Sequence, residues 1–360
     1  MSNAIERVGV IGAGQMGAGI AEVSAKAGAD VVVFEPTDEL AAAGKARIEA
    51  SLERAVGKGK LPADERDATL ARLRYTSTLS ELADRQLTIE AIVENEAVKA
   101  KVFAELDEII TDPHAVLASN TSSIPIMKIA AATKNPGRVL GLHFFNPVPV
   151  LPLVELISTL VTADEAVARV EHFAGEVLGK KVVRCGDRSG FIVNALLVPY
   201  LLSAIRMVES GVASVEDVDT AVVAGLSHPM GPLRLSDLIG LDTMKLIADA
   251  MYDELKDAHY APPPLLQRMV EAGQLGKIKI VGFDEDPVTL GGVKEGSIIG
   301  TVVQQPYEWG YQGMKLMAKY VGGDKSVIPA DPVIIIPTKI IDPTNVDSFW
   351  AELKQRTGAK

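Results

Sequence analysis

The chain has 360 residues, 48% of them hydrophobic, and a net charge of −11, from 36 Lys and Arg against 47 Asp and Glu. This length predicts two domains or slightly more, and the acidic balance without a basic cluster argues against nucleic acid or an anionic membrane as partner. The sequence has no run of about 18 apolar residues that predicts a transmembrane helix, no signal-peptide core and one cysteine, Cys185, so we expect a cytoplasmic protein without an intrachain disulfide.

The stretch from Arg7 to Pro36 has the pattern of a dinucleotide-binding unit. An apolar strand leads into three glycines in GxGxxG spacing, a helix of small residues (Met16 to Ala27), and a second strand (Asp30 to Phe34) followed by Glu35. In such a unit the first glycine permits a tight turn, the second lets the backbone approach a pyrophosphate, and the third lets the helix pack on the strand. An acid at the position of Glu35 accepts hydrogen bonds from an adenosine ribose and repels a 2′-phosphate. The motif by itself does not separate NAD from FAD, and a glycine-rich packing turn is the simpler alternative. The glycines are Gly12, Gly14 and Gly17.

A long helix is expected from Asp38 to Val56, and it is followed by a turn rich in Gly and Lys. Ser51 and Lys58 lie at the end of the helix and in the turn. A solvated surface is the simpler interpretation of these two residues. The functional interpretation is a clamp in which Lys58 meets a phosphate of a nucleotide-bearing substrate.

Polar side chains follow several buried strands at their carboxyl ends, where an open α/β sheet binds its ligands. The strand Gln86 to Glu94 precedes a helix that begins near Ala97 and contains Lys99. The strand Ala115 to Ser119 ends in Asn-Thr-Ser-Ser, which includes Ser122, and the strand Val139 to Phe144 carries His143. By spacing alone, His143 is as well explained by a hydrogen-bonded core histidine as by an acid–base catalyst.

Strand–helix alternation predicts a Rossmann-type α/β domain with a doubly wound parallel sheet over residues 1–186. An all-helical domain is expected over 187–277, with helices at 190–209, 215–224 and 233–255. A partial α/β tail is expected over 278–360, with strands at 278–283, 297–303 and 333–336 and helices at 307–320 and 346–353. We expect Cys185 to be a packed small hydrophobic residue rather than a nucleophile, because no histidine lies next to it in the sequence.

Six motifs together resemble the L-3-hydroxyacyl-CoA dehydrogenase family, and especially its stand-alone bacterial 3-hydroxybutyryl-CoA members, over residues 7–277. The motifs are GAGQMGAGIA, AIVENEAVK, SNTSSIPI, GLHFFNPVPVLPLVE, SGFIVNALLVPYL and HPMGPLRLSDLIGLDT. The resemblance implies NAD as cofactor, an acyl-CoA substrate and a homodimer formed through the helical domain.

The resemblance also implies residue roles. His143 matches the catalytic base, Glu155 the acid that orients it, and Ser122 and Asn194 the groups that hold the substrate oxygens. Ser51, Lys58 and Ser122 match contacts to the CoA substrate. The positions that match NAD contacts are Gly12, Gly14, Gly17, Glu35, Glu94, Lys99, Ser122 and Asn146; no metal ligand is implied.

The chain departs from that family after Lys277. The stretches IKIVGFDEDP, GTVVQQPYEWGYQGMKLM and IIIPTKIIDPTNVDSF resemble the C-terminal part of periplasmic sugar-binding proteins of the ribose type, and they indicate a fusion near residue 278. Asp284 and Gln304 match sugar contacts of that family, yet the facing lobe is missing. Two outcomes are open for the tail: a small α/β unit, or a segment without a stable fold for lack of its partner strands.

Three functions compete. The first is an NAD-dependent 3-hydroxyacyl-CoA dehydrogenase. The second is a sugar-binding or sensor module built on the tail, which has an incomplete cleft. The third is a crystallin-like relative that binds NAD without catalysis, against which stands the presence of Ser122, His143, Glu155 and Asn194.

Overall fold

The computed structural model describes residues 4–275 and, in the tail, residues 280–283, 294, 298–303, 339–341 and 344–357. The chain divides into two compact units. The first comprises Met1–Pro199 and Leu246–Ala261, and the second comprises Tyr200–Lys245 and Pro262–Lys360.

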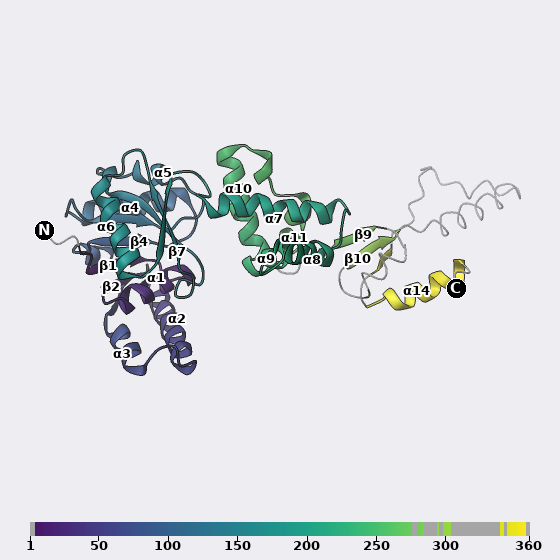
Figure 1. Ribbon diagram of the computed structural model, residues 1–360, viewed down its shortest axis with the longest axis horizontal. Helices are drawn as coiled ribbons and strands as arrows, with labels where there is room; N and C mark the ends of the chain where they lie inside the picture. Colours follow the sequence, from purple (N-terminus) through teal and green to yellow (C-terminus); the bar gives the residue numbers. More distant parts are fainter. Residues whose placement is uncertain are drawn as a thin grey trace, which may run out of the picture. The chain divides into compact units, whose positions relative to one another are not determined.

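The first unit contains an eight-stranded sheet in the order β3-β2-β1-β4-β5-β6-β7-β8. The sheet and the helices around it form the purple to teal part of the ribbon (Figure 1). This order, with the crossover next to β1, confirms the predicted doubly wound Rossmann-type sheet. Strand β3 was not predicted, because it has only four residues and most of them are partly exposed. The strands are β1 (Arg7–Ile11), β2 (Asp30–Phe34), β3 (Leu73–Thr76), β4 (Leu87–Glu90), β5 (Val116–Ser119), β6 (Val139–Phe144), β7 (Leu153–Ser158) and β8 (Lys181–Gly186).

One junction of this sheet is antiparallel. Strands β6 and β7 pair with His143 opposite Glu155, whereas all other neighbouring strands in the sheet are parallel. The connection between the two strands, residues 145–152, is too short for a parallel crossover, which needs a dozen or more residues. The short connection therefore forces the chain to turn back on itself.

Both faces of the sheet are buried. Side chains of a strand alternate between the two faces, so a strand that is buried on both sides contributes to two hydrophobic clusters. In β2, Val31 and Val33 join one hydrophobic cluster and Val32 joins the other. The helices of this unit are α1 (Gln15–Lys26), α2 (Asp38–Gly57), α3 (Ala63–Ala71), α4 (Glu96–Ile109), α5 (Ile126–Ala130) and α6 (Asp164–His172), with the 3₁₀ turns η1 (Leu79–Leu82), η2 (Pro136–Arg138) and η4 (Ala258–Tyr260) and the π-helical turn η3 (Phe173–Val177).

The remaining helices begin with α7 (Val193–Glu209), α8 (Val215–Leu226) and α9 (Pro232–Ile239), followed by α10 (Leu241–Leu255) and α11 (Pro264–Glu271). The sequence predicted one helix over 233–255, and the structure divides it in two. Gly240 has a φ of +96° at the break, which lies outside the helical region. Only glycine adopts such a positive φ at little cost. Asp219 caps the start of α9, because its carboxylate accepts the N–H groups of Leu233 (2.8 Å) and Arg234 (3.0 Å).

The described part of the tail contains a three-stranded sheet in the order β11-β10-β9 and one helix. These are β9 (Ile280–Phe283), β10 (Ile298–Val303), β11 (Lys339–Ile341) and α14 (Val346–Thr357). Strand β10 is parallel to β9 and antiparallel to β11. The strand expected at 333–336, the helix expected at 307–320, and Asp284 and Gln304 lie outside the described residues. Among the helices that the structure describes, none has the length and apolar character needed to cross a bilayer.

Candidate active site

The glycine-rich turn between β1 and α1 is built for close backbone contact. Gly12 has a φ of +95°, and its N–H donates to the Phe34 carbonyl at 2.9 Å. A Cβ atom on Gly17 would lie 1.9 Å from the Gly12 carbonyl oxygen, so only glycine lets α1 start this near the strand. Gly14, in contrast, faces open space, and no side chain caps the first N–H groups of α1. An exposed helix N-terminus behind an unobstructed backbone fits a dinucleotide pyrophosphate.

Glu35 lies at the carboxyl end of β2 beside this turn. Its carboxylate accepts the Ala13 N–H, and the Arg47 guanidinium donates to the Ala13 carbonyl at 3.1 Å. The acid is therefore at the edge of the glycine turn, where the sequence pattern expects the adenosine ribose.

His143 and Glu155 form a buried pair. The His143 Nδ1 atom lies 2.7 Å from a carboxylate oxygen of Glu155, and the two side chains are 5% and 1% exposed. The antiparallel pairing of β6 with β7 places them directly opposite each other. The second Glu155 oxygen accepts the N–H groups of Ile192 (3.1 Å) and Val193 (2.9 Å), at the start of α7.

The charge state of Glu155 decides the imidazole tautomer. Burial alone would raise the pKa of Glu155, but the His143 hydrogen bond and the two backbone N–H groups outweigh it and hold the pKa below its ordinary value. An ionised carboxylate only accepts, so in the neutral imidazole Nδ1 carries the proton and Nε2 is the acceptor. The Ser122 hydroxyl lies 3.1 Å from that Nε2 atom and donates to it.

Glu94 holds the loop that carries Ser122. One of its carboxylate oxygens accepts the Thr121 hydroxyl, the N–H groups of Ser122 (3.1 Å) and Ser123 (3.3 Å), and the Ser123 hydroxyl (3.1 Å). Burial opposes ionisation, yet the positive charge of Lys99 and these donors lower the pKa of Glu94. Glu94 therefore stays ionised and holds the loop in place through charge-assisted hydrogen bonds.

Two further predicted residues lie in segments that adjoin the pair in the chain. Asn146 follows β6, and its side-chain carbonyl accepts the Gln15 amide at 3.2 Å, which links the loop after His143 to the start of α1. Asn194 is partly buried in the first turn of α7, next to Val193, whose N–H binds Glu155. The Phe145 and Phe191 rings lie 4.6 and 5.5 Å from the imidazole and shield it from water.

A groove lies between α1, α2 and the loop 146–149, and it has a volume of about 370 Å³. Ser51 lines it, together with Arg47 and Arg54, which the sequence analysis did not single out. These three residues have i, i+4, i+7 spacing, and Lys58 continues the row just past the helix, although it does not line the groove. That spacing is the feature of the sequence from which Arg47 and Arg54 could have been predicted to share a helix face with Ser51. The buried Glu22 also lines the groove; burial raises its pKa, while Ser51 and the charges of Lys26 and Arg54 act in the opposite direction.

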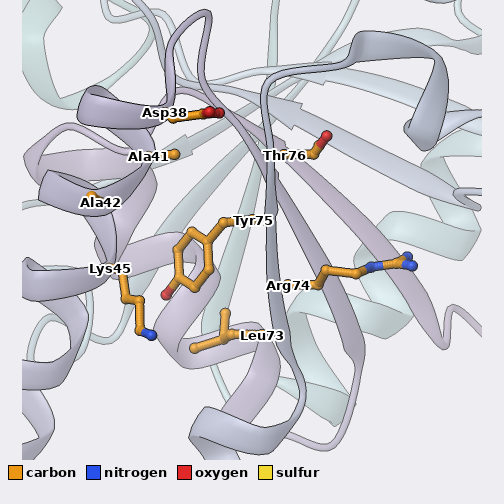
Figure 2. Close-up of a pocket in the computed structure, with 8 residues that line it drawn as sticks. All are labelled: Asp38, Ala41, Ala42, Lys45, Leu73, Arg74, Tyr75 and Thr76. Atoms are coloured by element: carbon orange, nitrogen blue, oxygen red, sulfur yellow. The ribbon is translucent and has the colours of Figure 1, made fainter.

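A second hollow, of about 350 Å³, lies between α2 and the edge strand β3. Figure 2 shows Tyr75 and Lys45 reaching toward it from opposite sides, while Arg74 points away. Burial and the charge of Glu49 raise the pKa of Tyr75 to about 12, and its buried hydroxyl has no partner among the described residues. None of the predicted site residues lines this hollow.

Cys185 packs against the hydrophobic cluster that contains Val32 and Leu117. Burial, with Glu155 and Asp187 nearby, raises its pKa to about 11, so the thiol stays protonated and is a poor nucleophile. Among the residues that the structure describes, no three His, Cys, Asp or Glu side chains gather in a way that would hold a metal ion.

A doubly wound sheet with an open glycine turn, an acid at the end of its second strand and an acid–histidine pair at its carboxyl edge is typical of a dinucleotide-dependent dehydrogenase. The family model "3-hydroxyacyl-CoA dehydrogenase, NAD binding domain" matches residues 7–188, and the C-terminal domain model of that family matches residues 190–286. The chain belongs to the 3-hydroxyacyl-CoA dehydrogenase family. A periplasmic binding protein domain model matches residues 248–325, which overlap the end of the dehydrogenase match.

Individual relatives agree with this assignment. A 3-hydroxybutyryl-CoA dehydrogenase of Mycobacterium tuberculosis is 72% identical over 283 residues, which cover 79% of this chain and 99% of the relative. A probable 3-hydroxybutyryl-CoA dehydrogenase of Deinococcus radiodurans is 46% identical over 277 residues, which cover 77% of this chain and 99% of the relative. The crystal structure of M. tuberculosis FadB2 superposes with a TM-score of 0.75 at 73% identity, over 76% of this chain and 96% of that one.

Proposed function

We propose that this enzyme interconverts L-3-hydroxyacyl-CoA and 3-ketoacyl-CoA, with 3-hydroxybutyryl-CoA as its substrate. The observation that carries the proposal is the series Ser122–His143–Glu155, in which the imidazole Nδ1 lies 2.7 Å from a carboxylate oxygen and Nε2 lies 3.1 Å from a hydroxyl oxygen. The choice of acyl group is supported by two relatives named for this substrate, one from Mycobacterium tuberculosis and one from Deinococcus radiodurans. Each is matched over almost its whole length.

In the oxidation, the imidazole Nε2 of His143 takes the proton of the substrate's C3 hydroxyl. Glu155 keeps the other nitrogen protonated and stabilises the imidazolium that forms. Ser122 and Asn194 are neutral donors that steady the developing charge on the substrate oxygen. When bound, NAD supplies the acceptor for the hydride that leaves C3. In the reverse direction, protonated His143 returns the proton to the ketone oxygen.

The cofactor site that we propose follows the β1–α1 turn and the carboxyl edge of the sheet. The open face of Gly14 supports a pyrophosphate there, and Glu35 supports an unphosphorylated ribose. The full set of proposed NAD contacts is Gly12, Gly14, Gly17, Glu35, Glu94, Lys99, Ser122 and Asn146.

The groove along α2 is proposed to receive the CoA moiety. Ser51, Arg47 and Arg54 line it, and Lys58 extends the row of cations. Arginine and lysine bind phosphate oxygens through charge-assisted hydrogen bonds, and CoA carries several phosphates. Ser122, at the imidazole, would meet the thioester end of the same substrate.

The organisation of the chain is proposed as residues 1–186 for NAD, 187–277 for substrate binding and homodimer formation, and 278–360 as a fused segment derived from a sugar-binding protein. Exposed apolar side chains on α7, α8 and α9, such as Leu196, Leu226 and Leu238, support a dimer surface. The match of residues 248–325 to a periplasmic binding protein domain supports the fusion. With a single cysteine in the chain, we place the enzyme in the cytoplasm.

The test is the absorbance of NADH on mixing the full chain with acetoacetyl-CoA and NADH. We expect a decrease that requires both reactants and scales with the amount of protein. A protein that binds NADH without consuming it would be the crystallin-like alternative, and this result would overturn the proposed function.

A further inference from the structure

A buried group of charges lies beneath the Ser122 loop, and the catalytic proposal does not use all of it. Glu90 ends strand β4 and is 0% exposed; Lys99 lies in the second turn of α4 and is 1% exposed. The Lys99 ammonium lies 2.6 Å from a Glu90 oxygen and 3.2 Å from a Glu94 oxygen. One cation is therefore shared by two carboxylates.

Glu90 is tightly held. The oxygen that meets Lys99 also accepts the Ile92 N–H at 2.8 Å, and its other oxygen accepts the Ser119 hydroxyl at 2.6 Å. Desolvating a carboxylate and an ammonium is costly, and such a pair often contributes little net stability compared with apolar residues. A role in positioning other groups accounts for a buried pair better than stability does.

The groups that it positions are on the far side of Glu94. One oxygen of Glu94 faces Lys99, and the other accepts the Ser122 and Ser123 N–H groups and two hydroxyls. The Ser122 hydroxyl then meets the Nε2 atom of His143 at 3.1 Å. A continuous series of contacts thus runs from β4, through Glu90, Lys99 and Glu94, to the acid–base pair.

We propose that Glu90 and Lys99 are positioning residues: together they hold Glu94 in place and ionised, so that the Ser122 loop is fixed against His143. This inference rests on the proposed roles of Ser122 and His143. Lys99 has a charge-balancing part as well. Without its ammonium, Glu90 and Glu94 would be two neighbouring carboxylates with no cation between them, and one would take up a proton at a higher pH than usual.

The first experiment compares Lys99→Met with Lys101→Met, two positions later on α4 and 79% exposed at its side chain. For Lys99→Met we expect a fall in kcat with acetoacetyl-CoA and NADH of about 10- to 100-fold, since a displacement of about 1 Å at reacting groups costs about 10²-fold. Lys99 is also a proposed NAD contact, so the Kd for NADH, measured by calorimetry, should rise, but by a smaller factor than kcat falls. Lys101→Met should keep the kcat of the natural chain.

The pH profile separates this role from a general loss of structure. As the pH falls, kcat of Lys99→Met should rise relative to kcat of the natural chain at the same pH, because protonating one of the two carboxylates removes their repulsion. The double variant Glu90→Gln/Lys99→Met, which removes one charge of each sign, should have a higher kcat than Lys99→Met and lose that acid recovery. An unchanged kcat in Lys99→Met, with a weaker Kd for NADH as the single effect, would overturn the proposal and make Lys99 only a cofactor contact.

A second variant keeps the test decisive if Lys99→Met does not fold. Glu90→Gln preserves the shape and an acceptor for the Ile92 N–H but leaves Lys99 with one carboxylate. We expect kcat to fall several-fold at an unchanged Kd for NADH, and an unchanged kcat would remove Glu90 from the positioning role. If the natural chain itself fails to turn over acetoacetyl-CoA, the proposed function is wrong. Normal turnover of the natural chain with no difference between the Lys99 and Lys101 variants refutes this inference alone.

Discussion

The acid–base pair and the α2 groove solve opposite electrostatic problems. His143 and Glu155 are almost completely buried, and both carboxylate oxygens and both imidazole nitrogens have partners. In the groove, Arg47, Arg54 and the neighbouring Lys58 are exposed to water. Proton transfer needs one fixed tautomer in a dry site, whereas phosphates bring their own charge and are bound well by solvated cations on flexible stems. Damage to the first region should therefore reduce kcat, and damage to the second should raise KM.

His143→Ala should have the largest effect. Removing a positioned acid–base group costs about 10²–10⁴-fold in rate, so kcat should fall by that amount while the Kd for NADH stays nearly the same. The exposed His114, whose imidazole pairs with Glu165 at the surface, offers a matched control. A natural kcat in His143→Ala would remove this residue from the mechanism.

Glu155→Gln should lower kcat by roughly 10²-fold or more, because an amide no longer stabilises the imidazolium and can impose the wrong tautomer. Stability provides a second readout. The pKa of Glu155 is lowered by folding, so its contribution to stability is present above the unfolded value near 4.5 and is lost as the pH falls through the folded value. The difference in Tm between the natural chain and Glu155→Gln should shrink in that acid range, and a pH-independent difference would contradict the ionised pair.

Cofactor preference tests the edge of the glycine turn. With Glu35 at the end of β2, a 2′-phosphate would face a carboxylate, and opposed like charges cost several kcal/mol. We expect kcat/KM for NADH to exceed that for NADPH by about 10²-fold, following that cost. Equal values would refute the role of Glu35.

Arg54→Ala and Lys58→Ala should raise the KM for acetoacetyl-CoA by about 3- to 10-fold each, in line with loss of a solvated charge contact of about 1 kcal/mol, with little change in kcat. Neither variant should affect acetoacetyl-N-acetylcysteamine, a thioester without phosphates. Lys45→Ala, on α2 but beside the second hollow, is the matched control. A raised KM for both thioesters would show a defect unrelated to phosphate, and a changed Kd for NADH would move the residue to the cofactor.

Cys185 should be inert, although it lies on β8 next to β7, which carries Glu155. Its pKa of about 11 leaves little thiolate at pH 8. Iodoacetamide at pH 8 should leave activity unchanged, as should Cys185→Ser. Rapid inactivation by the reagent that Cys185→Ser abolishes would show a reactive thiol near the pair.

The elements set by local pattern were predictable from the sequence. The strand, glycine turn, helix and Glu35 of the first unit occur within thirty consecutive residues, and their spacing alone defines a dinucleotide turn. Strand β3 escaped notice because it is short and half-exposed, and the break at Gly240 did so because a single glycine within a helical pattern does not reveal its φ.

The nonlocal pairings were decided by the tertiary structure. Neither His143 nor Glu155 indicates a partner twelve residues away, and they meet because the short connection between β6 and β7 forces an antiparallel pair. Likewise, nothing in the sequence distinguishes Glu90 and Lys99 from the many other charged residues. The fold buries both at the carboxyl edge of β4 and brings them together as an ion pair. The sequence alone determined which chemical groups are available and the local turns that carry them. The fold decided which of them are removed from water and brought within hydrogen-bonding distance, because both depend on contacts between segments far apart in the chain.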